Sequence, residues 1–92
     1  MNTQIQRIKR MEAILEEGTS ALNKLNEALD NYIRLQPEIK ELQHYYENGW
    51  LDDFKADEAG LLPKDLKRGV LSEDQLYTFL EENDEIRTRI KL

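Results

Sequence analysis

The chain has 92 residues, of which 35% are charged and 39% hydrophobic, and its 19 acidic against 13 basic side chains give a net charge of −6. A negative charge of this size repels polyphosphate, so we expect no nucleic acid as a partner. The chain contains no cysteine, which excludes disulfides and thiolate metal sites, and no segment approaches the roughly 20 apolar residues that a membrane-spanning helix needs.

Size and residue types favour one small all-α domain. A chain of this length buries only about 60 to 65% of the surface that its unfolded form exposes, so its core is thin. Leucine and isoleucine greatly outnumber valine, which favours helices over strands. The first turns carry charges and lack the apolar stretch of a signal peptide. We therefore expect a single cytoplasmic domain over residues 1–92.

A long helix is predicted over residues 3–35. Thr3 and Gln6 have the spacing of a capping box, in which side chains satisfy backbone N–H groups left unpaired at a helix start. Apolar residues then recur at alternating steps of three and four, the period that keeps one helix face against a neighbour. The residues at this spacing are Ile8, Met11, Leu15, Gly18, Leu22, Leu25, Leu29 and Tyr32. Because the period continues through Gly18, one helix is favoured over a break there.

A second apolar row runs beside the first. Its members are seven residues apart: Ile14, Ala21, Ala28 and Leu35. This row widens the apolar stripe beyond the narrow seam of a two-stranded coiled coil, so the helix should touch two neighbours. A second chain would cover the extra row, and we therefore expect self-association, as a homodimer.

Pro37 marks the next boundary. Proline disfavours helical geometry at Gln36, cannot donate to the carbonyl of Ile33 and fits best at the first position of a new helix. The sequence therefore predicts a corner or tight hairpin, followed by a helix over residues 37–47. The alternative is a kinked helix that runs straight through Pro37.

The helix predicted over residues 37–47 turns three side chains inward: Ile39, Leu42 and Tyr46. Asn48 and Gly49 follow it, and both suit the left-handed conformation at a helix C-terminus. We expect the helix to end at this pair.

The connector that follows, residues 49–72, is predicted to hold two short helices over about 50–59 and 63–68. Gly60 ends the first, Pro63 opens the second and Gly69 closes it. Both helices thus have ordinary start and stop residues.

The last helix is predicted over residues 73–90. Ser72 and Gln75 form a second capping box, and apolar residues stand at the two positions that pack across a helix start. Acidic residues lie in its first turn and basic residues in its last, as the helix dipole favours. The side chains expected to be buried are Leu76, Phe79, Leu80, Ile86 and Ile90.

Two acids of the connector stand where a helix disfavours them. Asp57 and Glu58 end the first short helix, where negative charge opposes the dipole by about 0.3 to 1 kcal/mol each. Basic residues a few positions downstream can fold back over these acids, namely Lys64, Lys67 and Arg68. The alternative is a bound cation or a basic partner.

A metal site is the other interpretation of the acidic residues, for which the weak candidates are Asp52, Asp53, Asp57 and Glu58. An EF-hand that starts at Asp53 would place Lys55 at a ligand position, so the calcium motif fails. His44 is the only histidine, and a surface position on the second helix accounts for it. With no phosphate loop, nucleophile elbow or paired-carboxylate motif, we expect neither a cofactor nor an enzyme.

An aromatic ridge is formed by Tyr45, Tyr46, Trp50 and Phe54, the last three at steps of four. Tyrosine and tryptophan are enriched where protein partners bind. In so small a domain, however, their large apolar area is needed in the core. We therefore expect the ridge to close one end of a helical bundle beneath the connector.

The stretches "LQPEIKEL" and "YYENGWLDDFKADEAGLLPKDLKRGVLSEDQLY" resemble a family of short bacterial proteins known only as a domain of unknown function, family 4298. The likeness covers about Arg7–Glu85 and is strongest from Trp50 to Asp74. It implies a single all-helical, cytoplasmic, bacterial domain, and it brings no activity, cofactor or catalytic residue with it.

Together these features predict a small antiparallel helical bundle built on one long N-terminal helix. The function they favour is a non-enzymatic interaction or structural module that binds a protein partner or a second copy of itself. The alternative is a module that binds a cation or another ligand through the acidic segment Asp52–Glu58.

Overall fold

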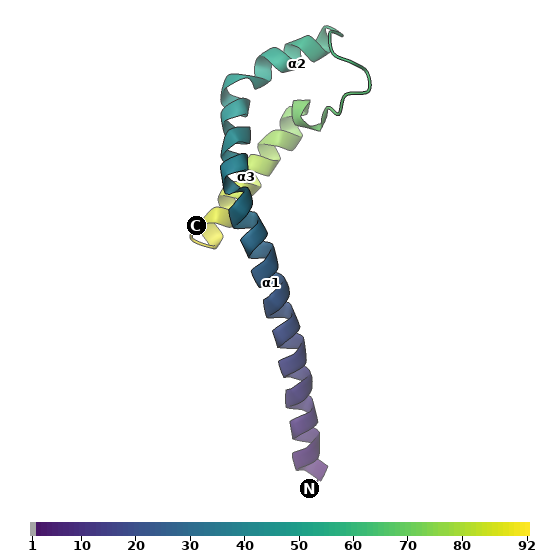
Figure 1. Cartoon of the computed structure of the whole chain (residues 1–92), viewed down its shortest axis with the longest axis vertical. Helices are drawn as coiled ribbons and strands as arrows, with labels where there is room; N and C mark the ends of the chain where they lie inside the picture. Colours follow the sequence, from purple (N-terminus) through teal and green to yellow (C-terminus); the bar gives the residue numbers. More distant parts are fainter. Residues whose placement is uncertain (1) are drawn as a thin grey trace. The chain divides into compact units, whose positions relative to one another are not determined.

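The computed structural model describes residues 2–92, and within that range the chain is helical with no strand (Figure 1). Its elements are α1 (Asn2–Asn48), α2 (Trp50–Glu58), the single 3₁₀ turn η1 (Gly69–Leu71) and α3 (Glu73–Arg89). The prediction of an all-α fold with a long N-terminal helix is confirmed. Across the described residues, no helix has both the length and the apolar character to cross a bilayer.

The chain divides into two compact units, Met1–Gln36 and Pro37–Leu92. The described part of the first unit is the N-terminal part of α1. The second unit contains the end of α1 together with α2, η1 and α3. The single domain expected over residues 1–92 is not tested by this division and stays a prediction.

The break predicted at Pro37 is wrong, because the segments 3–35 and 37–47 belong to one helix, α1. Pro37 has no N–H to donate to the carbonyl one turn earlier. The side-chain amide of Gln36 donates to the Tyr32 carbonyl at 3.1 Å and so adds a hydrogen bond in the turn before the proline. The neighbouring sequence has no glycine that would let the chain leave the helix, and helix formation on both sides outweighs the local cost of proline.

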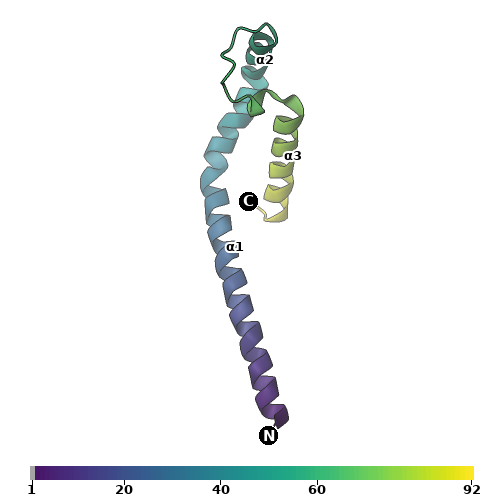
Figure 2. The ribbon, with the colours of Figure 1, turned by 90° about the vertical axis from the view of Figure 1, so that its right-hand side faces the viewer.

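The second unit has its own hydrophobic core. Its buried apolar side chains are Trp50, Leu71, Leu76 and Leu80. The residues packed around them are Ile39, Leu42, Tyr45, Tyr46, Phe54 and Leu62. The inward direction predicted for the apolar residues after Pro37 is thereby confirmed. Figures 1 and 2 show α3 returning beside the C-terminal end of α1 in the opposite direction.

The start of α3 follows its prediction. The Ser72 hydroxyl accepts a hydrogen bond from the backbone N–H of Gln75 at 3.4 Å, and both Leu71 and Leu76 are buried. The helix then ends at Arg89, one residue short of the predicted end.

The buried face of α3 is narrower than predicted. Leu76, Leu80 and Asn83 are buried, at the i, i+4 and i+7 positions of a single helix face. Phe79, one residue before Leu80, lies about 100° around the helix and is exposed. Ile86 and Ile90 are exposed as well, so the prediction of their burial is also wrong. Within this unit the thin core covers only one face of α3.

The glycines that flank α2 act differently from each other. Gly49 has φ −121°, so the left-handed conformation predicted there is wrong, and a Cβ at this position would lie in ordinary contact with the Tyr45 ring at 3.4 Å. Gly60 has φ +71° and ends α2 as predicted. Its N–H donates to the Asp57 carbonyl, and the N–H of Leu61 donates to the Ala56 carbonyl, which is the paired hydrogen bonding of a Schellman motif.

The short helix predicted over residues 63–68 is wrong. This segment contains only turns and bends, and the one short helical element nearby is η1. The side chain of Arg68 donates to the carbonyls of Pro63, Lys64 and Leu66, and of these three, within the described residues, only the Pro63 carbonyl also accepts a backbone hydrogen bond, from the N–H of Leu66 at 3.3 Å.

The continuity of α1 can be tested by removing its proline. Pro37→Ala restores an N–H that can donate to Ile33 and removes the ring clash, so we expect the free energy of unfolding to rise by about 2 kcal/mol. Urea denaturation followed by circular dichroism measures this change. Glu38→Ala, the adjacent exposed position in the same helix, is the control and is expected to change stability by less than about 0.5 kcal/mol. A loss of stability in Pro37→Ala would show that the native chain conformation requires the proline.

Candidate functional site

The connector is organised around the indole of Trp50. This side chain is only 6% exposed and stands at the first position of α2. Its Nε1–H donates to the carbonyl of Val70 in η1 at 2.9 Å. A buried N–H without a partner costs about 1 to 3 kcal/mol, so this hydrogen bond determines where η1 lies against α2.

The aromatic ridge packs inside the second unit. The ring of Phe54 stacks on Trp50 with centroids 5.0 Å apart and planes 17° apart. The ring of Tyr46 lies tilted against the indole, with centroids 6.0 Å apart and planes 59° apart. The structure therefore places these three rings against the core and not in a row on the surface.

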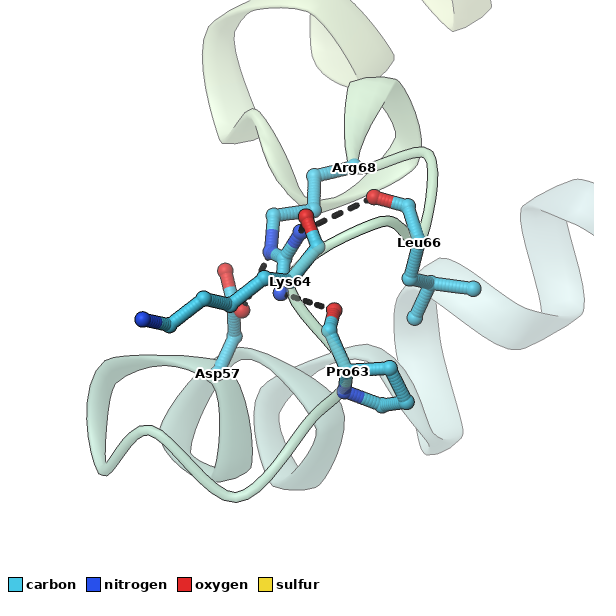
Figure 3. A network of polar contacts seen from close by, with 5 residues as sticks. All are labelled: Asp57, Pro63, Lys64, Leu66 and Arg68. Carbon is cyan, nitrogen blue, oxygen red and sulfur yellow. Dashed lines mark hydrogen bonds and ion pairs between the residues drawn. The ribbon is translucent and has the colours of Figure 1, made fainter.

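Arg68 holds the remainder of the connector together (Figure 3). Its Nε donates to Asp57 Oδ1 at 2.6 Å, and both side chains are partly buried. Its terminal nitrogens donate to three backbone carbonyls, those of Pro63 at 2.5 Å, Lys64 at 3.0 Å and Leu66 at 2.9 Å. One guanidinium thus pairs with the acid at the end of α2 and satisfies the carbonyls of a segment without regular structure.

The three basic residues expected to fold over the acids differ in what they do. Arg68 forms the ion pair with Asp57, whereas Lys64 contributes its backbone carbonyl to Arg68. Lys67 is exposed and lines a shallow hollow of about 310 Å³. The other residues lining this mostly apolar hollow are Tyr45, Asp53, Leu62, Leu66, Val70 and Leu71.

Asp53 is paired with Tyr45, which the sequence placed in the aromatic ridge without indicating this contact. The Tyr45 hydroxyl donates to Asp53 Oδ2 at 2.7 Å across the turn between α1 and α2. Burial raises the pKa of Tyr45 to about 12, and the hydrogen bond and the negative charge of Asp53 add to this effect. The two residues are eight positions apart on different helices, so no local spacing indicates the pair.

The acidic candidates for a metal site are not brought together. Asp57 is engaged by Arg68, Asp53 by Tyr45, and Asp52 and Glu58 are exposed on α2. Across the described residues 2–92, no group of three potential ligands is close enough to hold a metal ion.

The second candidate functional feature is the exposed apolar face of α1. In the unit that ends at Gln36, large apolar side chains of the predicted stripe stand open at one-half to two-thirds of their surface. The exposed fractions are 54% for Ile8 and Met11, 63% for Leu15, 62% for Leu22 and 61% for Leu25. The members of the second row are exposed too, including Ile14 at 45%. The stripe is therefore exposed from Ile8 to Leu25, whereas its last two members, Leu29 and Tyr32, are partly buried.

The amino-acid sequence matches one protein family over residues 8–91, which includes most of α1 and all of α2, η1 and α3. That family is described as a domain of unknown function (DUF4298). The chain belongs to the DUF4298 family. Comparison with curated proteins and with solved structures gives no significant match. DUF4298 membership confirms the resemblance seen in the sequence and assigns no activity.

Arg68 offers a test of how the connector is held. Arg68→Ala removes the donor to Asp57 and to the carbonyls of Pro63, Lys64 and Leu66, of which Pro63 keeps the N–H of Leu66, and we expect it to lower the free energy of unfolding by about 2 kcal/mol. Arg68→Lys is expected to lose most of the same amount, because an ammonium group cannot make the forked contacts. Lys67→Ala is the control, since its side chain is exposed and next in sequence. Equal stability of the Arg68→Ala and Lys67→Ala variants in urea denaturation would contradict this role.

The raised pKa of Tyr45 predicts an alkaline loss of stability. Its folded pKa of about 12 lies above the unfolded value of 10.0, so the stabilisation is complete below about pH 10 and is lost as pH rises toward 12. The unfolding free energy should therefore fall over that range by a larger amount in the native chain than in Tyr45→Phe. Tyr77→Phe, at an exposed tyrosine, should fall as the native chain does. Identical pH profiles for the native chain and Tyr45→Phe would refute the assignment.

Proposed function

We propose that this chain is a non-enzymatic helical interaction module that self-associates through the N-terminal part of α1. The observation that carries the proposal is the exposed apolar stripe on the unit Met1–Gln36. A row of large side chains at a three-four period buries its surface well only against another helix. Burial of this stripe is the main source of free energy for association, at roughly 25 cal/mol for each Å² of apolar surface.

The stability of the helix supports the same proposal. Helices in water are marginal on local hydrogen bonds alone, and most of their stability in proteins comes from packing an apolar face. The stripe residues from Ile8 to Leu25 are open to solvent, and Gly18 in the middle of the helix costs about 1 kcal/mol relative to alanine. Contacts with a second chain would supply the missing packing energy.

The connector is, in this proposal, the structural part of the molecule. Trp50, Phe54 and Arg68 contact groups of the second unit, namely its core, Asp57 and backbone carbonyls. The alternative function, a cation or ligand site at Asp52–Glu58, has less support because two of its four acids are engaged by Arg68 and Tyr45. We also propose the cytoplasm as the location, since a chain without cysteine gains no disulfide from an oxidising compartment.

Self-association can be tested by placing a charge in the stripe. The native chain is expected to sediment at twice 10.9 kDa at micromolar concentration, and Leu22→Lys to sediment at 10.9 kDa with a lower helix content, because a charge cannot be buried in the apolar contact. Ser20→Lys introduces the same charge two residues earlier, on the opposite helix face, and should remain associated. A native chain that sediments at 10.9 kDa would refute the proposal.

A further inference from the structure

We propose that the hollow beside Tyr45 binds a free α-amino acid with an apolar side chain, whose ammonium group pairs with Asp53 and whose carboxylate pairs with Lys67. The hollow has a volume of about 310 Å³ and lies entirely within the unit Pro37–Leu92. It contains no residue of the α1 stripe, so this ligand site is independent of the self-association proposed above.

The walls of the hollow are apolar and are held in place by contacts of the connector. Val70 is fixed through its carbonyl, which accepts from the Trp50 indole, and Leu66 through its carbonyl, which accepts from Arg68. Figure 3 shows the Leu66 side chain extending away from that guanidinium. The aliphatic lining consists of Leu62, Leu66, Val70 and Leu71, beside the Tyr45 ring. Walls that are positioned before a ligand arrives lose little conformational freedom on binding.

Part of this apolar lining is open to solvent. Leu66 is 47% exposed and Val70 is 39% exposed. Removing such surface from water favours the binding of an apolar group. The volume stands at the lower end of the range of about 300 to 1,000 Å³ that is typical of ligand pockets, so the hollow suits a small ligand.

Asp53 supplies a negative charge to the hollow. Its Oδ2 accepts from the Tyr45 hydroxyl at 2.7 Å, which fixes the orientation of the carboxylate. Its Oδ1 accepts no hydrogen bond from any residue that the structure describes. An ammonium group is a strong partner for this oxygen, since charge-assisted hydrogen bonds are about twice as strong as neutral ones.

Lys67 supplies a positive charge to the same hollow. Its side chain is exposed, and within residues 2–92 its ammonium group forms no ion pair, not even with Asp53. The flexible four-carbon stem of lysine lets the ammonium group follow the carboxylate of a ligand. Two opposite charges that line one hollow without pairing are complementary to a ligand that carries both charges.

The combination of two charges and apolar walls discriminates between classes of ligand. A simple amine is attracted by Asp53 and repelled by Lys67, and a simple carboxylic acid meets the reverse. A sugar would place hydroxyl groups against aliphatic walls that offer them no hydrogen bonds. An amino acid with an apolar side chain satisfies both charges and also covers the walls.

Titration of the full isotope-labelled chain with L-leucine, followed through its amide NMR shifts, tests the site. We expect saturable shifts for residues 62–71, with a dissociation constant below about 1 mM. L-Glutamate is the matched ligand, and its charged side chain should weaken binding at least about tenfold because the aliphatic walls cannot solvate it. Absence of saturable shifts with leucine, or equal affinity for glutamate, would overturn the proposal.

Two variants, each paired with a ligand analogue, assign the charges. Lys67→Met removes the ammonium group, so it should weaken leucine binding about fivefold without weakening that of leucine amide, which has no carboxylate. Asp53→Asn should weaken leucine binding about fivefold without weakening that of N-acetyl-leucine, which has no ammonium group. Lys67 is exposed and makes no side-chain contact that the fold requires, so its variant remains folded for the measurement. Equal losses for leucine and its analogue in either variant would contradict the proposed pairing.

A truncation of the wall tests the position of the site. Leu66→Ala removes apolar contact area and should weaken leucine binding about fivefold. Leu61→Ala is the control, because Leu61 is 75% exposed in the same connector and lies outside the lining. Urea denaturation of both variants establishes that they are folded at the temperature of the titration. Equal leucine affinity in the two folded variants would show that the ligand does not occupy this hollow.

Discussion

The hydrogen bond from the Trp50 indole to the Val70 carbonyl is the constraint on which the fold of Pro37–Leu92 depends. The ring has to be buried because the small core has few other large side chains, and its N–H then needs an acceptor. The acceptor lies 20 residues further along the chain, in η1. One side chain therefore ties the first residue of α2 to the turn from which α3 begins, and Ser72 starts that helix directly afterwards.

Arg68 donates hydrogen bonds to carbonyl groups of the connector, as backbone N–H groups do in regular secondary structure. Carbonyl groups in a segment without helix or strand need donors, and in a short connector few backbone N–H groups are positioned to supply them. The guanidinium supplies three such donor contacts and pairs with Asp57 at the same time. The acidic residue at the unfavourable end of α2 is therefore a partner for this arginine, and the negative charge is offset from within the chain.

Features decided by neighbouring residues could be predicted from the sequence, and those decided by distant residues could not. The Ser72 cap and the stop at Gly60 depend on four or five consecutive residues, and both are present. Arg68, and not Lys64 or Lys67, pairs with Asp57, and it also donates to three carbonyls. The positions of those carbonyls are defined only in the folded connector. At Pro37 the tendency of proline to end a helix competes with the helix-forming tendency of the residues on both sides. The second tendency prevails, and the predicted turn is absent. Phe79 has the spacing of a buried residue, yet the unit offers no second layer to cover it.

The two units of the chain obtain their stability from different sources. Pro37–Leu92 encloses its own core, whereas the stripe from Ile8 to Leu25 is open to solvent. The proline that begins the second unit also interrupts the backbone hydrogen-bond ladder of α1 at one place, which weakens the coupling of helix formation on its two sides. Amide protons before the proline will therefore exchange with solvent through openings of their own segment, which leave the tryptophan core closed.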